Sequence, residues 1–264
     1  MRKVEVLVAA MNKDISLYEK MNLKTDAIII NQCDKLDRYE TCINGKNVKF
    51  YSYPERGVGR SRNHALMSAS GEICLLADED MIYVDGYENI VIEAFNKFRR
   101  ADAIIFQVNS LNPERPLATM NHTGKISLKR AIRYGACRIA FKRESILRKN
   151  IWFSLMFGGG ATYGSGEDTI FISDLYKNGL NVYSYNKKIA DIIQENSSWF
   201  TGYNEKYFFD KGALYYAMYP RYAKIITLYS GFKMYKRLDR KFSYFDIVKW
   251  LYNGINDYKL RLES

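Results

Sequence analysis

The segment Glu72-Ile-Cys-Leu-Leu-Ala-Asp78-Glu79-Asp80 joins an apolar run of strand length to three consecutive acids. In a parallel α/β sheet, binding sites are built at the carboxyl ends of the strands. Two carboxylates two positions apart, such as Asp78 and Asp80, can share one divalent cation directly or through water, and such a cation neutralises a diphosphate. The alternative is a strand followed by a solvated acidic turn, so the flanking sequence decides between the two.

Strands and helices alternate around this segment. Apolar runs predict strands at 4–10, 26–31, 48–53, 73–77, 103–108 and 181–185, and helical spacing predicts helices at 58–69, 86–100 and 169–177. This alternation favours an α/β fold with a mainly parallel central sheet that helices cover on both faces.

Composition narrows the class of protein. The chain has 264 residues, of which 47% are hydrophobic, so it can bury a core of domain size. It has no apolar run long enough to cross a membrane, and its first residues do not form a signal peptide. The four cysteines show no metal-binding spacing, which favours reduced thiols and a cytoplasmic protein. The net charge of +11 indicates an anionic partner.

Composition changes near residue 199. Residues 199–264 hold 19 of the 39 aromatic residues, with 12 Lys or Arg against 6 Asp or Glu. We therefore expect one catalytic α/β domain over 1–198 and an aromatic, basic helical extension over 199–264. The aromatic rings either cover the sheet and line an acceptor cleft or contact a membrane surface. In the second case the extension's cations would face anionic lipid, namely Lys233, Lys236, Arg237, Arg240 and Lys241.

Three further clusters of polar residues accompany the acids. The second strand ends in Asn31, Gln32 and Asp34, which can hydrogen-bond a base and a ribose. A glycine-containing loop opens the next helix with Arg60 and Arg62, whose guanidinium groups suit phosphate oxygens. The alternative, structural interpretations are that Asp34 caps the strand end and that Arg60 and Arg62 are solvated residues on the helix surface. The fourth cluster, Glu167 and Asp168, follows a glycine-dense loop and could simply complement a helix dipole.

The motifs taken in order resemble glycosyltransferase family 2, the inverting transferases of GT-A fold. The matching stretches are Gly59-Arg-Ser-Arg-Asn63, Ser70-Gly-Glu-Ile-Cys-Leu-Leu-Ala-Asp-Glu-Asp80 and Gly164-Ser-Gly-Glu-Asp168, and the resemblance covers roughly residues 4 to 195. It implies a GT-A (Rossmann-like) sheet and transfer of a sugar, with inversion, from a nucleotide-diphosphate sugar, most simply a UDP-sugar. The acceptor would be a glycan or a lipid-linked glycan of surface polysaccharide biosynthesis.

The resemblance also implies roles for residues. Asp80 and Asp78 would hold Mn²⁺ or Mg²⁺, and Asp168 would be the base that takes the proton of the acceptor hydroxyl, with Glu167 beside it. The donor would be bound by Asn31, Gln32, Asp34, Arg60, Arg62, Asp78 and Glu79. The acceptor would meet the glycine loop at Gly159 and Gly160, and Trp199. A peripheral contact with an anionic membrane is part of the same expectation, and no nucleic acid is expected.

Two departures from the family pattern stand out. The first strand ends in Ala9-Ala-Met-Asn12 where Pro-Thr-Tyr-Asn is usual, which leaves the packing on the base open. Many relatives also carry a late histidine at the metal site, and Gln194 stands about where it would be expected. This leaves a cation held mainly by Asp80 and the diphosphate. His64 and His122 are interpreted as structural or surface residues.

Three other functions stay open. A sugar-phosphate nucleotidyltransferase would need a glycine-rich loop after the first strand, and Ala9–Asn12 contains no glycine. A nucleic-acid-binding protein would use the positive charge and the aromatic rings, but the acids of the expected cleft would repel phosphate. A catalytically degenerate GT-A scaffold is the third, and the missing histidine is its only support.

Overall fold

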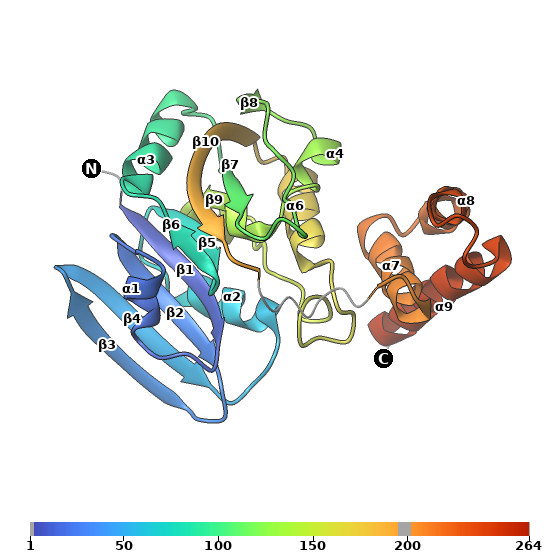
Figure 1. The fold of residues 1–264 in the computed structure, drawn as a ribbon, viewed down its shortest axis with the longest axis horizontal. Helices are drawn as coiled ribbons and strands as arrows, with labels where there is room; N and C mark the ends of the chain where they lie inside the picture. Colours follow the sequence, from blue (N-terminus) through green and yellow to red (C-terminus); the bar gives the residue numbers. More distant parts are fainter. Residues whose placement is uncertain (1–2, 195–201, 264) are drawn as a thin grey trace.

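The computed structural model describes residues 3–194 and 202–263. Within them, ten strands form one sheet in the order β3-β4-β2-β1-β5-β9-β7-β10-β6, with β8 paired to β10 (Figure 1). The strands are β1 Val4–Met11, β2 Asp26–Gln32, β3 Asp37–Ile43, β4 Lys46–Tyr53, β5 Ile73–Asp78, β6 Met81–Tyr83, β7 Ala103–Ser110, β8 Gly124–Lys125, β9 Ile139–Lys142 and β10 Val182–Ile192.

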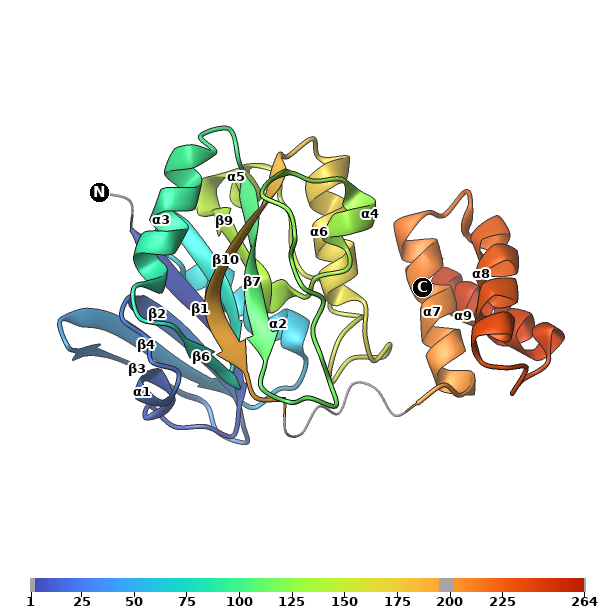
Figure 2. The same cartoon turned by 45° about the horizontal axis from the view of Figure 1, so that its top comes forward.

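The helices alternate with these strands and then form a separate group at the C-terminal end. They are α1 Leu17–Lys20, α2 Val58–Ser68, α3 Tyr87–Lys97, α4 Leu128–Ala131, the 3₁₀ turn η1 Ala136–Arg138, α5 Arg143–Arg148, α6 Glu167–Lys177, α7 Glu205–Met218, α8 Ala223–Arg237 and α9 Tyr244–Glu263. Both ribbon views show α7, α8 and α9 beside the sheet on the side of α6 (Figure 2). The predicted α/β class with a C-terminal helical extension is confirmed.

The centre of the sheet follows from alternating apolar residues. Strands β4, β2, β1 and β5 run parallel in that order, as do β7 and β10. In β1, Val4, Val6 and Val8 enter one core and Leu7 enters the other. Because strand side chains alternate between faces, a strand with apolar residues on both faces requires cover on both sides.

Helices provide that cover. Helices α1 and α3 contribute Leu17, Tyr18, Val91 and Phe95 to the first core. Helices α2 and α6 contribute residues such as Leu66, Phe171 and Leu175 to the second. The helices cover the two faces of the sheet. The carboxyl ends of β1, β2, β4 and β5, which lie at one end of the sheet, are where a binding site is expected.

The antiparallel strands are the part that the apolar pattern did not predict. Strand β9 lies antiparallel between β5 and β7 in the middle of the sheet, and β3 forms an antiparallel hairpin with β4. Residues 139–142 are too few and too close to basic residues to show a strand period. The predicted strand 181–185 is the first half of β10, which continues to Ile192 through two register shifts.

The C-terminal helices pack closely because two glycines remove side chains at a crossing. A Cβ on Gly212 of α7 would lie 1.9 Å from the carbonyl oxygen of Leu251, and one on Gly254 of α9 would lie 1.8 Å from that of Phe209. Neither position tolerates a side chain without moving the helices apart. In the part of the chain that the structure describes, no helix combines the length and apolarity needed to span a bilayer.

This helical bundle is joined to the glycine loop that precedes α6. Asp210 accepts a hydrogen bond from Gly164 N at 3.0 Å, and the Tyr163 hydroxyl donates to Asp257 at 2.7 Å. Phe157 and Tyr163 of the loop also pack against Leu214 of α7. The predicted boundary at 198/199 lies outside the described residues, so the division into two domains stays a prediction.

Candidate active site

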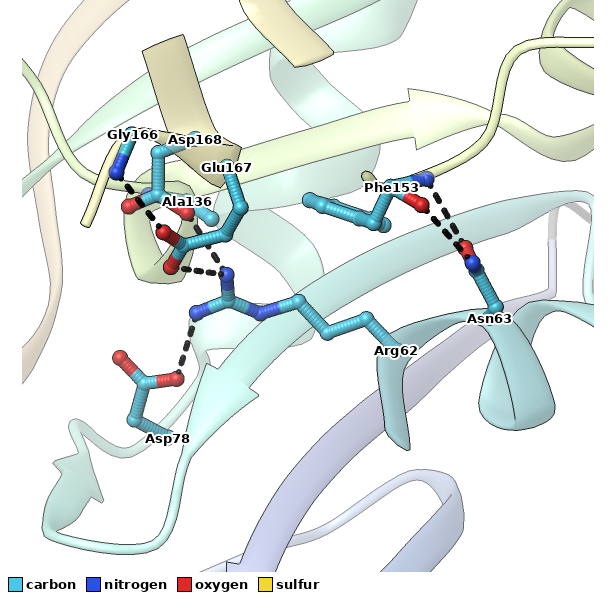
Figure 3. A network of polar contacts seen from close by, with 8 residues as sticks. All are labelled: Arg62, Asn63, Asp78, Ala136, Phe153, Gly166, Glu167 and Asp168. Carbon is cyan, nitrogen blue, oxygen red and sulfur yellow. Dashed lines mark hydrogen bonds and ion pairs between the residues drawn. The ribbon is translucent and has the colours of Figure 1, made fainter. Parts of the chain in front are cut away.

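One buried arginine organises the candidate site. Arg62 lies on α2, and its side chain is only 4% exposed. Its Nη2 donates to Asp78 Oδ1 at 2.9 Å, and its Nη1 lies 3.2 Å from Glu167 Oε1 and 2.6 Å from Asp168 Oδ1 (Figure 3). The structure thus brings together the acidic end of β5, the start of α6 and the arginine helix, which are three of the four clusters that the sequence singles out.

Local contacts explain why Arg62 points inward. The next residue, Asn63, makes two hydrogen bonds with the backbone of Phe153. The Asn63 Nδ2 donates to the Phe153 carbonyl oxygen at 3.0 Å, and the Asn63 Oδ1 accepts from Phe153 N at 2.9 Å. Gly59 permits this approach, because a Cβ there would lie 2.3 Å from the carbonyl oxygen of Ser154. The Arg62 guanidinium lies 5.3 Å from the centre of the Phe153 ring. Helix α2 is therefore clamped to segment 153–154 with Arg62 facing the acids.

The charges in this cluster perturb one another. Burial disfavours the charged form of Arg62, but the three carboxylates outweigh burial and raise its pKa. Burial and the neighbouring charge of Asp168 raise the pKa of Glu167 well above its usual range, against the opposing effect of Arg62. One guanidinium cannot fully compensate three carboxylates, so a proton is held most readily on Glu167.

Asp168 is oriented on both carboxylate oxygens. Its Oδ1 faces Arg62, and its Oδ2 accepts a hydrogen bond from Ala136 N at 2.8 Å. Its side chain is nevertheless 27% exposed, so a substrate hydroxyl can reach it. A fixed, accessible carboxylate is the arrangement that a general base requires.

Asp80 occupies a different environment from Asp78. Its Oδ2 accepts a hydrogen bond from the backbone N of Gln194 at 3.2 Å. Burial and the nearby charge of Asp78 raise the pKa of Asp80 to about 6. Gln194 thus lies beside Asp80, and its side-chain oxygen accepts a hydrogen bond from Ser110 at 3.3 Å.

Asp78 and Asp80 could hold a divalent cation only if other ligands came from water or substrate. Among residues 3–194 and 202–263, no group of three or more His, Cys, Asp or Glu side chains could hold a metal ion. However, burial and then the charge of Asp78 raise the pKa of Asp80, and a bound cation would offset that repulsion between carboxylates. Mg²⁺ is often held by one or two carboxylates with water and substrate phosphates as its other ligands. The residues present fit a cation of that kind.

A cavity of about 320 Å³ opens next to Asp80. Its lining includes Asn12, Lys13 and Lys20, which follow β1, together with Glu79. Glu79 accepts a hydrogen bond from Met11 N and lies 3.4 Å from the Lys13 ammonium, so it ties the end of β1 to the turn after β5. Lys13 and Lys20 are not among the site residues that the sequence predicts. Their signal was the polar run that follows the first strand.

The polar end of β2 is mostly engaged in structural contacts. Asn31 is buried, accepts a hydrogen bond from Lys13 N at 2.9 Å and donates to Ser52 at 3.2 Å. Gln32 accepts one from Gly57 N at 2.7 Å, which fixes the loop before α2. Asp34 pairs with Arg56 at 2.8 Å, with its side chain 91% exposed. Their predicted contacts with a donor stay predictions.

Three of the remaining predicted residues, Arg60, Gly159 and Gly160, lie in or against the start of α2. Arg60 is half exposed and lies 3.2 Å from Glu55. Gly159 accepts a hydrogen bond from Val58 N at 3.0 Å, and a Cβ on Gly160 would lie 3.0 Å from Gly57 N, so the glycine loop lies against the start of α2. Trp199 lies outside the described residues. The predicted phosphate contact of Arg62 stays a prediction, since its guanidinium is here bound to carboxylates.

Comparison with known proteins agrees on the fold. No family model matches the chain, and no curated protein sequence matches it. Among solved structures, Staphylococcus aureus TarS residues 1–349 in complex with UDP-GlcNAc matches with a TM-score of 0.61 at 18% identity, over 81% of this chain and 66% of that one. The same TarS fragment in complex with UDP gives 0.59 at 16%, over 81% and 65%.

A longer TarS chain matches 91% of this chain but only 44% of its own length, with a TM-score of 0.60 at 18% identity. The chain therefore spans less than two thirds of the TarS chains that it matches. At such low identity the likeness shows the fold alone. The predicted GT-A-type architecture is confirmed. TarS, which has this fold, was solved in complex with UDP-GlcNAc.

Proposed function

We propose that the chain is an inverting glycosyltransferase that transfers a sugar from a nucleotide-diphosphate sugar, UDP-linked, to a hydroxyl group of a glycan or lipid-linked glycan. The proposal depends mainly on one observation. Arg62 joins Asp78, on the expected donor side, to Asp168, the expected base, through contacts of 2.9 and 2.6 Å. The fold shared with TarS, which binds UDP-GlcNAc and UDP, supports the donor class.

The proposed reaction uses these residues in distinct roles. The acceptor oxygen attacks the anomeric carbon of the donor sugar as its proton passes to Asp168. The bond between that carbon and the diphosphate oxygen breaks, and the nucleotide diphosphate leaves with the bonding electrons. Attack opposite the leaving group inverts the anomeric centre. Arg62 holds Asp168 in place, so its carboxylate loses little freedom when the acceptor binds.

The donor side would be formed by Asp80, Asp78 and the cavity beside them. When bound there, Mn²⁺ or Mg²⁺ would supply charge neutralisation for the leaving diphosphate. Lys13 and Lys20 line the same cavity and offer ammonium groups to phosphate oxygens. Membership of glycosyltransferase family 2, a role in surface polysaccharide synthesis and a cytoplasmic location belong to the same proposal.

A catalytically degenerate GT-A scaffold is the second candidate. It is favoured by the absence, among the described residues, of three or more side chains grouped to hold a metal ion. The acids grouped around Arg62 oppose nucleic-acid binding, since they would repel phosphate backbone at the opening.

The experiment that separates these functions is thermal unfolding with UDP, GDP, CMP and their sugar conjugates, with and without Mn²⁺. A ligand at a hundred times its dissociation constant stabilises the folded state by about 2.7 kcal/mol. Metal-dependent stabilisation by one nucleotide that is lost in Asp80→Ala, together with slow release of nucleotide from its sugar conjugate, supports the transferase. Stabilisation without any turnover supports the scaffold, and no stabilisation by any nucleotide contradicts both.

A further inference from the structure

Helix α8 has small residues on its buried side and large apolar residues on its exposed side. Its buried positions are Ala223, Thr227 and Gly231. The exposed side carries Ile225, Tyr229 and Phe232, and Tyr222 stands at the N-cap before them; Tyr222, Ile225, Tyr229 and Phe232 are 62%, 66%, 71% and 48% exposed. These four residues, here called the α8 stripe, recur at intervals of three, four and three residues, so they form one line along the helix.

The α8 stripe reverses the usual pattern of a surface helix, which turns its apolar residues to the core and polar residues to water. Single exposed apolar residues are ordinary in soluble proteins. A continuous line of them opposite the buried side is not, and it marks a surface that is covered by a partner.

The charges around the stripe show what kind of partner it is. Helix α8 contains no Asp or Glu and four cations, Lys224, Lys233, Lys236 and Arg237. Lys236 lies with its ammonium 4.5 Å from the centre of the Phe232 ring, and Lys233 follows Tyr229 by four residues. Lys233 and Lys236 therefore lie on the same side as the apolar residues, so the partner presents apolar and anionic groups together.

We propose that the α8 stripe and its cations bind the surface of an anionic phospholipid membrane, with the helix lying in the plane of the interface. Apolar residues beside Lys and Arg are the features of helices that lie at this interface. The 15 residues of α8 span about 22 Å, whereas a bilayer core is about 30 Å thick, so the helix lies on the membrane and does not cross it.

Two other occupants fit less well. A symmetric contact between two copies through the stripe would bring Lys233 and Lys236 of both chains into one interface, and like charges at an interface are costly. A nucleic acid would complement the cations and the tyrosines but would leave the aliphatic Ile225, 66% exposed, and Leu228, 45% exposed, against phosphate and water.

This surface extends the proposed function, because the bundle that carries α8 also contacts the glycine loop of the candidate site through Asp210 and Gly164. Membrane binding at α8 would bring that site to a lipid-linked acceptor. Vesicle binding needs neither donor nor acceptor, so the two proposals can fail separately.

The test is co-sedimentation of the full chain with vesicles of phosphatidylglycerol and phosphatidylcholine, compared with vesicles of phosphatidylcholine alone. We expect binding only to the anionic vesicles, weakened by added salt. Ile225→Ser/Tyr229→Ser and Lys233→Glu/Lys236→Glu should each reduce the partition coefficient by at least about ten-fold. Both pairs are exposed, so unfolding temperatures should stay at the wild-type value.

Matched controls make the result specific to α8. Leu260→Ser changes an apolar residue of the same bundle whose exposure, 66%, equals that of Ile225. Lys129→Glu/Arg130→Glu makes the same change in net charge on exposed residues of α4. Both controls should bind like wild type. The proposal is overturned if wild type does not bind, if the α8 variants bind as well as wild type, or if the controls lose binding equally. A wild-type dimer that the α8 variants convert to monomer, without vesicle binding, would assign the stripe to self-association.

Discussion

The guanidinium of Arg62 lies 2.6 Å from a carboxylate oxygen of Asp168, although the two residues are 106 positions apart in the sequence. The same guanidinium also binds Asp78 and Glu167, so one buried cation fixes the relative positions of a strand end and a helix start. A change at Arg62 should therefore affect both stability and catalysis. A change at one of the three carboxylates should affect mainly the step in which that carboxylate takes part.

Arg62→Ala should destabilise the protein strongly, because it leaves three carboxylates close together without their counter-charge. Removing one partner from a buried ionic cluster costs about 3–5 kcal/mol. For a chain of this size, each kcal/mol lowers the unfolding temperature by about 2–4 °C. Arg60→Ala is the control, because Arg60 is half exposed and pairs with Glu55. Equal unfolding temperatures for the two variants would contradict the organising role of Arg62.

Asp168→Asn should abolish transfer while leaving donor binding unchanged. A general base contributes about 10²–10⁴ in rate, and the amide cannot accept the proton of the acceptor. Asp174→Asn is the matched control on the same helix, where the carboxylate pairs with Lys177 at 3.2 Å. The measurement is turnover beside nucleotide-induced thermal stabilisation. If Asp168→Asn keeps more than a tenth of wild-type turnover, the base lies elsewhere.

Asp80→Asn should change the dependence of stability on pH in a defined direction. The pKa of Asp80 is raised to about 6 from an ordinary value of 3.8. The folded state thus binds this proton more tightly than the unfolded state, and the resulting stabilisation is present below about pH 4 and is lost as pH rises to about 6. The variant lacks this proton, so its unfolding temperature relative to wild type should rise over that interval.

Unfolding temperatures measured from pH 4 to pH 7 test this expectation, with Asp34→Asn as the exposed control that should follow wild type throughout. Mn²⁺ or Mg²⁺ should stabilise wild type more than Asp80→Asn above pH 6, since the ionised carboxylate is the form that binds cations. A difference between variant and wild type that stays constant with pH would show that Asp80 is not electrostatically strained.

The parts of this structure that the sequence predicts are those with long local patterns. The valines of β1 and the apolar run that ends at Asp78 identify the central parallel strands, because both faces of the sheet are buried there and nearly every position is apolar. Strand β9 was not predicted, because Ile139–Lys142 is short and forms a strand through its pairing with β5 and β7. The pairing of β9 depends on tertiary contacts, which the local sequence pattern does not reveal.

The candidate site shows the same division. The residue types at 78, 167 and 168 could be recognised from motifs, but the choice between Arg60 and Arg62 as the buried arginine could not. Two residues apart on a helix, their side chains point about 160° apart, and the docking of Asn63 on Phe153 determines which of them meets the acids. The cavity at Lys13 and Lys20 likewise depends on how α1 folds back beside β6.

Asp210→Ala should loosen the glycine loop without disturbing the donor side. Asp210 is buried, accepts a hydrogen bond from Gly164 N at 3.0 Å and pairs with Lys206, which itself donates to Thr162 O at 3.1 Å. Truncation leaves the Gly164 amide unpaired, at a cost of about 1–3 kcal/mol for a buried group. Amide hydrogen exchange in residues 158–166 should therefore accelerate, while stabilisation by nucleotide stays at the wild-type value.

Asp246→Ala, at an exposed position in the first turn of α9, is the control for a lost carboxylate in the same bundle and should leave exchange in the loop unchanged. If the loop orders the acceptor, Asp210→Ala should also raise the KM for the acceptor more than it lowers kcat, because the base at Asp168 is held separately by Arg62 and Ala136 N. Unchanged exchange at 158–166 in Asp210→Ala would mean that the packing of Phe157 and Tyr163 on Leu214 holds the loop without the hydrogen bond.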